Sequence, residues 1–488
     1  MSSALSDQTV TEHGTLFIGG QWREPNGREK ITVVSPNSGE EIGSVPLANR
    51  ADIDSAVSAA RKAFDDPSVW SGLEPAERAA HLRRFADELE ARGEQIASLV
   101  SSQNGMPVTI AGQMEAVYPA TLLRYYADLI EKQTPDLREG MMGGVVEVQR
   151  QPIGVVGAIV PWNYPQSLAA FKYAPALAAG CTMVIKPSPE TVLDSVVLAE
   201  AAEAAGLPAG VVNIVPGGRD EGAYLVEHPE IDKVAFTGST AAGKKIAEVC
   251  GRLLRPVTLE LGGKSASIVL DDAELDLETI GNDLFVSTLV NNGQTCFLGT
   301  RVLAPKSRYG EVVDALTAFA GSMAVGDSLD PATQIGPMAT QTHLGRVEGY
   351  IEKGRAEGGR ITTGGGRPEG RDGGWFVSPT VFADVNNSDT IAREEIFGPV
   401  LSVIQYDDDA DAVRIANESE YGLGGTVWSS DPERARNVAS RVNTGTIGIN
   451  RYIPDPVAPF GGVKHSGMGR ELGPEGLAAY QNLKSIYR

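Results

Sequence analysis

The chain has 488 residues, of which 42% are hydrophobic and 22% charged, and its formal net charge is −21. This composition is ordinary for a globular protein, and the length allows about three domains. So negative a charge argues against nucleic acid as a partner, because neutralising phosphates takes clustered Lys and Arg. No apolar run reaches the ~18 residues of a membrane-spanning helix, so we expect no membrane partner.

The N-terminal residues and the cysteines indicate the cytoplasm. Residues Met1 to His13 are polar and lack the charged and apolar regions of a secretory signal. The three cysteines, Cys181, Cys250 and Cys296, are too few and too scattered for a disulfide framework. Without a CxxC pair, and with dispersed histidines, the sequence predicts no metal site.

The first half of the chain passes from helices to alternating strands and helices. Apolar residues spaced by three and four predict helices over 51–64 and 75–101. Short apolar strands follow at 155–160, 183–186, 211–215 and 234–237. Helices are expected after them at 167–179, 190–205, 221–227 and 241–254. This alternation predicts a parallel sheet covered on both faces, which in doubly wound folds binds nucleotides at the carboxyl ends of its strands.

A second α/β pattern begins after Leu270. We expect helices at 277–291 and 310–323, and strands at 301–304, 401–406, 426–429 and 446–450. The Gly- and Arg-rich segment 363–374 is typical of a surface loop or hairpin. Residues 136–149 interrupt the first domain and look like an excursion from it.

Two residues suggest covalent catalysis by a thiol. Cys296 follows the Gly-bearing turn Asn291–Thr295, and Glu260 lies on a strand-like segment 36 residues earlier. A thiolate is a strong nucleophile, and a carboxylate whose pKa is raised by burial can act as a general base. The alternative is an inert buried thiol, which we expect for Cys181 and Cys250, together with a solvated glutamate.

The segment Phe236–Lys244 resembles a phosphate-binding loop of the form G-x-x-x-x-G-K-[ST]. Its last position is Lys245, so the hydroxyl that binds magnesium is missing and NTPase activity is disfavoured. Gly238 and a helix N-terminus at Ser239 suit the pyrophosphate of a dinucleotide instead.

Two further residues lie at predicted strand ends. Asn163 stands between Pro161 and Pro165, either in a structural turn or as an amide donor to a developing oxyanion. Lys186 ends the next strand, where it is either solvated or within reach of a ribose hydroxyl.

These residues together resemble the aldehyde dehydrogenase superfamily, NAD(P)-dependent and of the hydrolytic type. The likeness extends from Phe17 to the C-terminal strand, and its short motifs occur in the family's order. They are Pro161–Pro165, Lys186–Ser188, Phe236–Ser239, Leu259–Lys264, Gly293–Cys296, Glu394–Pro399, and Pro459–Lys464 with Ser466 and Gly467.

The resemblance implies an α/β fold with two doubly wound Rossmann-like domains and a small β oligomerisation domain. The NAD(P)-binding domain would comprise 1–124 and 150–258, and the catalytic domain 259–469. The oligomerisation domain would join 125–149 to 470–488. A homodimer or homotetramer is implied.

The resemblance also assigns chemical roles. Cys296 would attack the aldehyde carbon, while the Asn163 amide and the Cys296 N–H stabilise the oxyanion. Hydride passes to the nicotinamide and leaves a thioester, which water activated by Glu260 hydrolyses. Lys172 and Glu471 match positions that assist proton transfer.

The cofactor positions follow from the same resemblance. Lys186 would bind the adenosine ribose, Ser239 the pyrophosphate, and Glu395 with Phe397 the nicotinamide ribose. The other implied cofactor contacts are Ile159, Val160, Pro161, Trp162, Ser188, Pro189, Gly218, Gly222, Phe236, Thr237, Gly238 and Leu261.

One position departs from the family pattern. Many NAD-preferring members carry Glu where Pro189 stands here, with Glu190 beside it. The missing carboxylate weakens the case against NADP, whose 2′-phosphate it would repel. We favour NAD over NADP, because Glu190 can substitute and the chain is strongly negative.

The substrate is expected to be a medium-sized hydrophobic aldehyde. Positions implied to line its tunnel are Met114, Tyr118, Tyr164, Phe171, Thr295, Phe297, Tyr452 and Phe460. A semialdehyde remains the alternative if Arg451 or Arg124 serves as a clamp. A coenzyme A-acylating enzyme is disfavoured because those members lack the base at Glu260, and a non-catalytic binding protein on the same fold is the remaining alternative.

Overall fold

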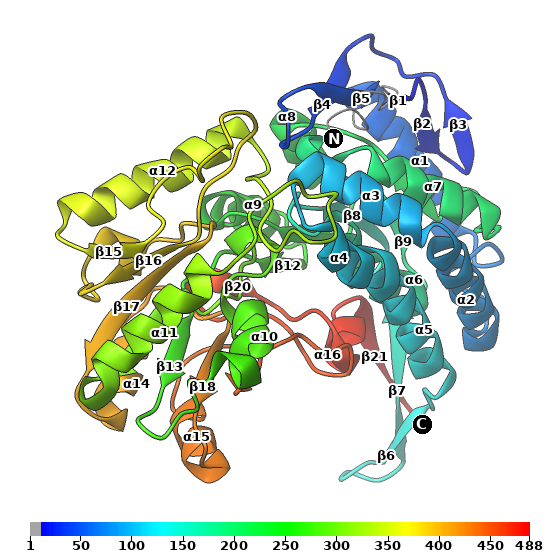
Figure 1. Cartoon of the computed structure of the whole chain (residues 1–488). Coiled ribbons are helices and arrows are strands. Elements are labelled where there is room, and N and C mark those ends of the chain that lie inside the picture. The colour runs from blue at the N-terminus through cyan, green and yellow to red at the C-terminus, as the bar shows by residue number, and fades with distance from the viewer. Residues whose placement is uncertain (1–10) are drawn as a thin grey trace.

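The computed structural model describes residues 11–488, in two lobes built around two large sheets (Figure 1). The prediction about a secretory signal falls mainly on residues 1–10, outside this range. Both large sheets are doubly wound, so the predicted α/β class is confirmed.

The first sheet has eight strands in the order β20-β12-β11-β8-β9-β10-β2-β3. The run from β12 to β10 is parallel, and β20, β2 and β3 pair antiparallel at its ends. Their bounds are β2 Leu16–Ile18, β3 Gln21–Arg23, β8 Val155–Ile159, β9 Thr182–Lys186, β10 Val212–Ile214, β11 Lys233–Thr237, β12 Val257–Glu260 and β20 Gly467–Met468. Strands β8, β9 and β11 are buried at every residue, which their continuous apolar runs predicted. The strand order reverses between β8 and β11, and doubly wound sheets usually bind their ligands at the carboxyl ends of the strands beside such a point.

Helices cover both faces of this sheet. They are α1 Arg50–Asp65, α2 Pro75–Ala91, α3 Gly93–Asn104, α4 Val108–Ala111, the π-helical turn η1 Gly112–Val117, α5 Tyr118–Glu131, α6 Pro165–Ala179, η2 Pro189–Thr191, α7 Asp194–Ala204, α8 Arg219–Glu227 and α9 Thr240–Arg252. Helix α1 begins with a capping box between Asn49 and Asp52. The single helix predicted over 75–101 is wrong: the backbone leaves helical geometry at Arg92, before Gly93, and two helices result.

The second sheet has seven strands in the order β15-β16-β17-β14-β13-β18-β19, all parallel except β15. Their bounds are β13 Ala266–Val269, β14 Arg301–Pro305, β15 Arg360–Thr363, β16 Thr380–Ala383, β17 Val400–Tyr406, β18 Gly425–Trp428 and β19 Gly448–Ile449. The remaining helical elements after α9 are α10 Leu277–Thr288, η3 Asn291–Gly293, η4 Lys306–Arg308, α11 Tyr309–Gly321, α12 Gln341–Ala356, α13 Thr390–Arg393, α14 Asp409–Asn417, α15 Pro432–Ala439, η5 Lys464–Ser466 and α16 Gly473–Ala478.

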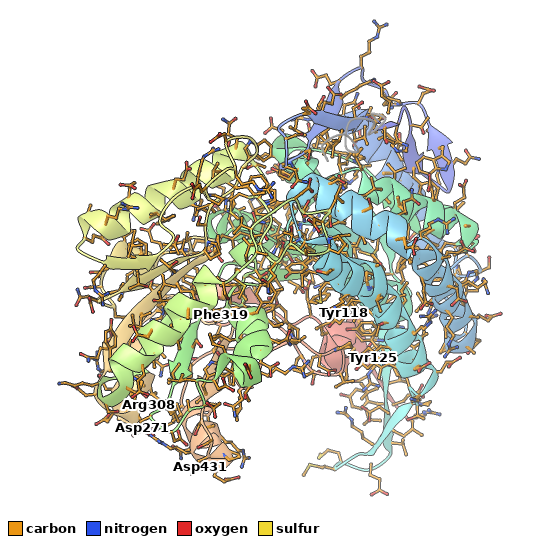
Figure 2. The ribbon with its side chains drawn as sticks, viewed as in Figure 1. Tyr118, Tyr125, Asp271, Arg308, Phe319 and Asp431 are labelled. Atoms are coloured by element: carbon orange, nitrogen blue, oxygen red, sulfur yellow. The ribbon has the colours of Figure 1, made fainter. Side chains whose placement is uncertain are left out.

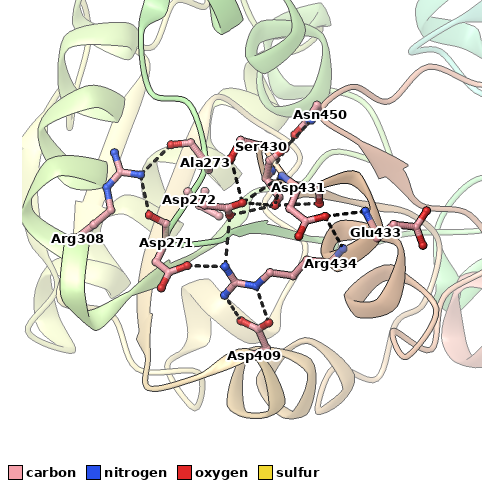
Figure 3. A network of polar contacts seen from close by, with 12 residues as sticks. Asp271, Asp272, Ala273, Arg308, Asp409, Ser430, Asp431, Glu433, Arg434 and Asn450 are labelled. Atoms are coloured by element: carbon pink, nitrogen blue, oxygen red, sulfur yellow. Dashed lines mark hydrogen bonds and ion pairs between the residues drawn. The ribbon is translucent and has the colours of Figure 1, made fainter.

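A polar network closes the carboxyl edge of this second sheet (Figure 3). Arg434 on α15 forms ion pairs with Asp271 and Asp272, which follow β13, and with Asp409, which begins α14. Asp272 also accepts hydrogen bonds from Ser429. In Figure 2 this edge, marked by Asp271, lies at the lower left of the molecule, in the other lobe from Tyr118 on α5. Protein groups therefore occupy the position where this kind of sheet usually binds a ligand.

Two small sheets complete the fold. β21 Gln481–Tyr487, β7 Val145–Pro152 and β6 Asp136–Glu139 form an antiparallel sheet that projects below the first lobe (Figure 1). β1 Thr11–Glu12, β5 Glu41–Pro46 and β4 Lys30–Val34 form the other. The domain limits given above stay a prediction: α5 runs through residue 125, and β20 belongs to the first sheet.

Two kinds of feature are absent from residues 11–488. No helix there is long and apolar enough to cross a membrane. The same residues contain no group of three or more His, Cys, Asp or Glu that could hold a metal ion.

Candidate active site

A strained turn carries Cys296 between the two lobes. Asn291, Asn292 and Gly293 have φ of +53°, +60° and +75°, a left-handed run that non-Gly residues seldom adopt. The Asn292 side chain stabilises it, because its Nδ2 donates to Gly105 O at 2.8 Å. At Gly293 a Cβ atom would lie 2.2 Å from Gly398 O, so no side chain fits there.

The Cys296 thiol lies beside two carboxylates. The residue is partly exposed, and it borders a small pocket together with Glu395, Phe397 and Gly263. Burial, then Glu395 and Glu260, raises the pKa of the Cys296 thiol well above its usual value. The free site therefore holds a protonated thiol at neutral pH, and the nucleophile forms only when a base removes that proton.

Asn163 is fixed against the turn that carries the thiol. Its Nδ2 donates to Gln294 O at 3.1 Å, and its backbone carbonyl accepts from Asn291 Nδ2 at 2.9 Å and Asn104 Nδ2 at 3.3 Å. The side chain is 5% exposed. The structure thus brings Asn163 and Cys296 together from two lobes.

Glu260 ends β12 and is 2% exposed. β20 holds it by the pairing of Glu260 with Gly467. No hydrogen-bond partner reaches either carboxylate oxygen from the described residues. A Cβ atom at Gly461 would lie 2.5 Å from Glu260 Oε1, so a glycine at this position leaves space for the Glu260 carboxylate. Burial, and next Glu471, raises the pKa of Glu260 well above its usual value.

Lys172 and Glu471 form a buried ion pair behind Glu260. Lys172 Nζ lies 2.8 Å from Glu471 Oε1 and donates to Thr237 Oγ1 at 2.6 Å. Lys172 belongs to α6, whereas Thr237 ends β11. The positions expected to assist proton transfer are therefore adjacent to the expected base.

The expected cofactor contacts of the first lobe lie at the carboxyl ends of β8 and β11. Ile159 ends β8 and precedes Val160, Pro161 and Trp162; Phe236 and Thr237 end β11. Ser239 caps α9 by accepting Ala242 N–H at 3.3 Å. A Cβ at Gly238 would lie 2.6 Å from the Phe236 ring, and one at Gly243 would lie 2.5 Å from Leu261. Close backbone approach at a helix N-terminus fits an anionic pyrophosphate.

Lys186 lies one strand further along. Its buried Nζ donates to Pro187 O at 2.8 Å and to Gly217 O at 2.6 Å. Burial lowers the pKa of Lys186 to about 8, although the negative charges of Glu190 and Glu221 act to raise it. Ser188 and Pro189 follow it, and a Cβ at Gly222 would lie 3.4 Å from Lys186 Cε. Gly218 begins α8.

Helix α12 holds the segment with Glu395 and Phe397. Glu395 Oε1 accepts Gly263 N–H at 2.8 Å, and burial raises the pKa of Glu395 to about 7. Phe397 has φ of +64°, and its carbonyl bonds His343 Nε2 at 2.6 Å. Arg346 Nη2 donates to Glu395 O at 2.6 Å. Sequence reasoning missed His343 and Arg346; their spacing of three on a helix is a signal, but α12 was not predicted.

The expected substrate wall is a chain of aromatic rings. Ring centroids lie 6.0 Å apart for Tyr118–Phe171, 6.0 Å for Phe171–Phe460, 6.4 Å for Phe297–Phe460 and 4.9 Å for Phe297–Tyr452. Phenol oxygens near the wall have protein partners, namely Pro454 O for Tyr118, Thr446 Oγ1 for Tyr452 and Thr295 Oγ1 for Tyr164. Met114 packs against the same core. The rings of the expected substrate wall thus present an apolar surface.

The two candidate clamps for an anionic substrate are already paired. Arg124 forms ion pairs with Asp87 and Glu90 on α2. Arg451 lies 3.6 Å from Asp283 on α10.

Known proteins match this chain over nearly its full length. The model of the aldehyde dehydrogenase family matches residues 22–486. Geranial dehydrogenase of Castellaniella defragrans is 57% identical over 477 residues, 98% of this chain and 99% of that protein. A Mycobacterium tuberculosis aldehyde dehydrogenase complexed with NAD+ matches with a TM-score of 0.95 at 47% identity, covering 98% of this chain and 99% of that one. A Pseudomonas syringae aldehyde dehydrogenase C mutant, complexed with NAD+ and octanal, matches with a TM-score of 0.93 at 38% identity, covering 100% of this chain and 98% of that one.

Proposed function

The chain belongs to the aldehyde dehydrogenase family, and we propose that it oxidises a medium-sized hydrophobic aldehyde to the acid through an adduct on Cys296. One observation carries the proposal. Asn163 is hydrogen-bonded to the turn before Cys296, and the unpartnered Glu260 carboxylate is close enough to raise the pKa of that thiol.

NAD is the proposed cofactor, with NADP as the alternative, because the two solved relatives above contain NAD+. Gly238, where a Cβ atom would meet the Phe236 ring, and the helix start at Ser239 fit a dinucleotide. Lys186 would hold the adenosine ribose, Ser239 the pyrophosphate, and Glu395 with Phe397 the nicotinamide ribose. When bound, the cofactor supplies the two-electron acceptor of the oxidation.

The first half of the reaction needs a base and an oxyanion donor. The raised pKa of the Cys296 thiol requires that a nearby carboxylate take its proton before attack, and Glu260 and Glu395 contribute to that raised pKa. Attack by Cys296 then forms the thiohemiacetal. The Asn163 amide and the Cys296 N–H would stabilise its oxyanion in this water-poor site.

The second half needs a base for water. Glu260, with its raised pKa, would take a proton as water attacks the Cys296 thioester. The Lys172–Glu471 ion pair would pass that proton away from Glu260. Hydrolysis then releases the acid and restores the thiol, so coenzyme A is not required.

The substrate class rests on the aromatic wall. A chain of rings with bonded hydroxyls favours a tail without charge or hydrogen-bonding groups. The relative named for geranial and the structure with octanal support this class. A dicarboxylic semialdehyde is disfavoured because Arg124 and Arg451 are already paired.

A panel of aldehydes tests the proposal. We expect kcat/KM with NAD to be highest for branched or straight C8–C10 aldehydes, lower for acetaldehyde, and lowest for succinic semialdehyde. Cys296→Ala should abolish oxidation of all of them. Preference for the charged substrate would contradict the substrate class, and activity in Cys296→Ala would contradict the thiol route.

Assembly and location are proposed on separate grounds. Sheet β21-β7-β6 exposes Leu483 at 68% and Tyr487 at 79%, and Met141 and Met142 are fully exposed on its hairpin. We therefore assign this sheet to a homodimer or homotetramer contact, which light scattering measures. Because all three cysteines are free, a reducing cytoplasm stays the expected compartment.

A further inference from the structure

Position 189 is a proline and carries no carboxylate, but the carboxylates of Glu190 and Glu221 lie on either side of Lys186. Glu190 lies in the turn η2, which follows β9, and accepts a hydrogen bond from Ser188 Oγ. Glu221 lies in the first turn of α8, which follows β10. A Cβ atom at Gly217 would lie 2.6 Å from Glu221 Cβ and 3.6 Å from Lys186 Cδ, so Glu221 and Lys186 pack against the same glycine. The charges of Glu190 and Glu221 both favour the charged form of Lys186.

Glu221 also occupies the start of its helix. Its Oε2 accepts Gly218 N–H at 2.8 Å and completes a capping box. The Gly217 carbonyl, one residue earlier, accepts from Lys186 Nζ at 2.6 Å. The N-terminus of α8 is an anion-binding position by its dipole, but here a protein carboxylate already fills it.

NAD and NADP differ only at the adenosine ribose, where NADP carries an added phosphate with about two negative charges. Resting on the proposed function, which places that ribose at Lys186, we propose that Glu190 and Glu221 together exclude the 2′-phosphate. Ribose hydroxyls can donate to carboxylates, whereas a phosphate is repelled by them. Two carboxylates from neighbouring loops thus take the place of the one missing at Pro189.

A cation in the same loop gives the opposing arrangement. Arg219 precedes Glu221, is exposed, and forms no ion pair with the described residues. A guanidinium binds phosphate well. If Arg219 reached the ribose, the chain would favour NADP instead. The variant Arg219→Ala therefore distinguishes binding of the 2′-phosphate by Arg219 from its exclusion by the two carboxylates.

The test is equilibrium binding, measured by calorimetry on the full-length protein without aldehyde. The probes are NAD, NADP, AMP and adenosine 2′,5′-bisphosphate. Glu190→Gln, Glu221→Gln and the double variant keep an oxygen that can accept the Ser188 and Gly218 hydrogen bonds, so they remove charge without removing the cap. Glu227→Gln, at the far end of α8, is the matched control because it loses the same charge.

We expect the wild type and Glu227→Gln to bind NAD and AMP more tightly than their 2′-phosphorylated forms. In the double variant the ratio of the two dissociation constants should fall about tenfold or more, by tighter binding of the phosphorylated probes. An unchanged ratio in the double variant overturns the inference, as does tighter NADP binding by the wild type that Arg219→Ala abolishes. Failure of the wild type to bind either dinucleotide would instead refute the proposed cofactor, and with it the function.

Discussion

Replacing Glu260 with Gln separates the two halves of the proposed reaction. Gln has nearly the same shape but no basic oxygen. Because neither Glu260 oxygen has a hydrogen-bond partner in the described residues, the substitution breaks no contact and the fold should tolerate it. Loss of a general base slows the step that it serves by about 10²–10⁴-fold, or about 3–5 kcal/mol in activation free energy.

Stopped-flow absorbance of the reduced cofactor at 340 nm measures both halves in one trace. We expect Glu260→Gln to retain a burst of about one equivalent per subunit, followed by steady-state turnover lowered by the factor above. The wild-type turnover should also rise with pH, because Glu260 has a raised pKa and more of it becomes the basic form as pH increases. That rise should be absent from the variant.

Glu94→Gln is the matched control, since Glu94 is an exposed residue on α3. It should leave burst and turnover unchanged. If Glu260→Gln kept the wild-type steady-state turnover, Glu260 would not be the base for hydrolysis. A lost burst would show that Glu260 is already needed to take the thiol proton, and the division between the two halves would be wrong.

Three further changes probe the site and the fold. Asn163→Ala removes the proposed oxyanion donor, and kcat should fall about 10²–10³-fold while the dissociation constant of NAD, measured by calorimetry, stays unchanged. Arg434→Ala leaves three aspartates without their shared cation; because the side chains are 27–53% exposed, we expect a loss of only about 1–3 kcal/mol, seen in urea unfolding and reduced by salt. Burial raises the pKa of Glu115 to about 8. Above about pH 4.5 the unfolded chain has released the Glu115 proton, whereas the folded chain keeps it up to about pH 8. The free energy of unfolding therefore falls as pH rises between these two values. Glu115→Gln lacks this slope, and its free energy of unfolding relative to wild type should rise by about 2 kcal/mol from pH 5.5 to 7.5; a constant difference would contradict the raised pKa.

The sequence predicted those parts of the fold in which burial produces a local run of apolar residues. Strands β8, β9 and β11 are buried on both faces, so their residues are almost all apolar and were recognised. The break between α2 and α3 was not, because Arg92 leaves helical geometry inside an otherwise continuous apolar period. Helix α12 was missed too, although Leu344, Val347, Tyr350 and Ile351 recur at helical spacing on its one buried side.

The chemical groups of the site were easier to predict than their pKa values. Cys296, Glu260 and Asn163 were proposed from motifs, and the structure places them around one turn. The raised pKa of the thiol was not foreseen, because it depends on burial and on the carboxylates of Glu260 and Glu395, each far from Cys296 in the sequence. His343 escaped notice because it bonds a backbone carbonyl, which side-chain patterns do not encode.

The short strand β20 has a consequence for how the protein is made. Gly467 pairs with Glu260 and Met468 with Leu259, so the first sheet receives its last strand from near the end of the chain. A ribosome has therefore translated both lobes before Glu260, the proposed general base, can be held in its place in the first sheet. Nascent chains, and fragments cut short by proteolysis, should accordingly remain inert towards aldehydes in the cell, however well their first lobe has folded.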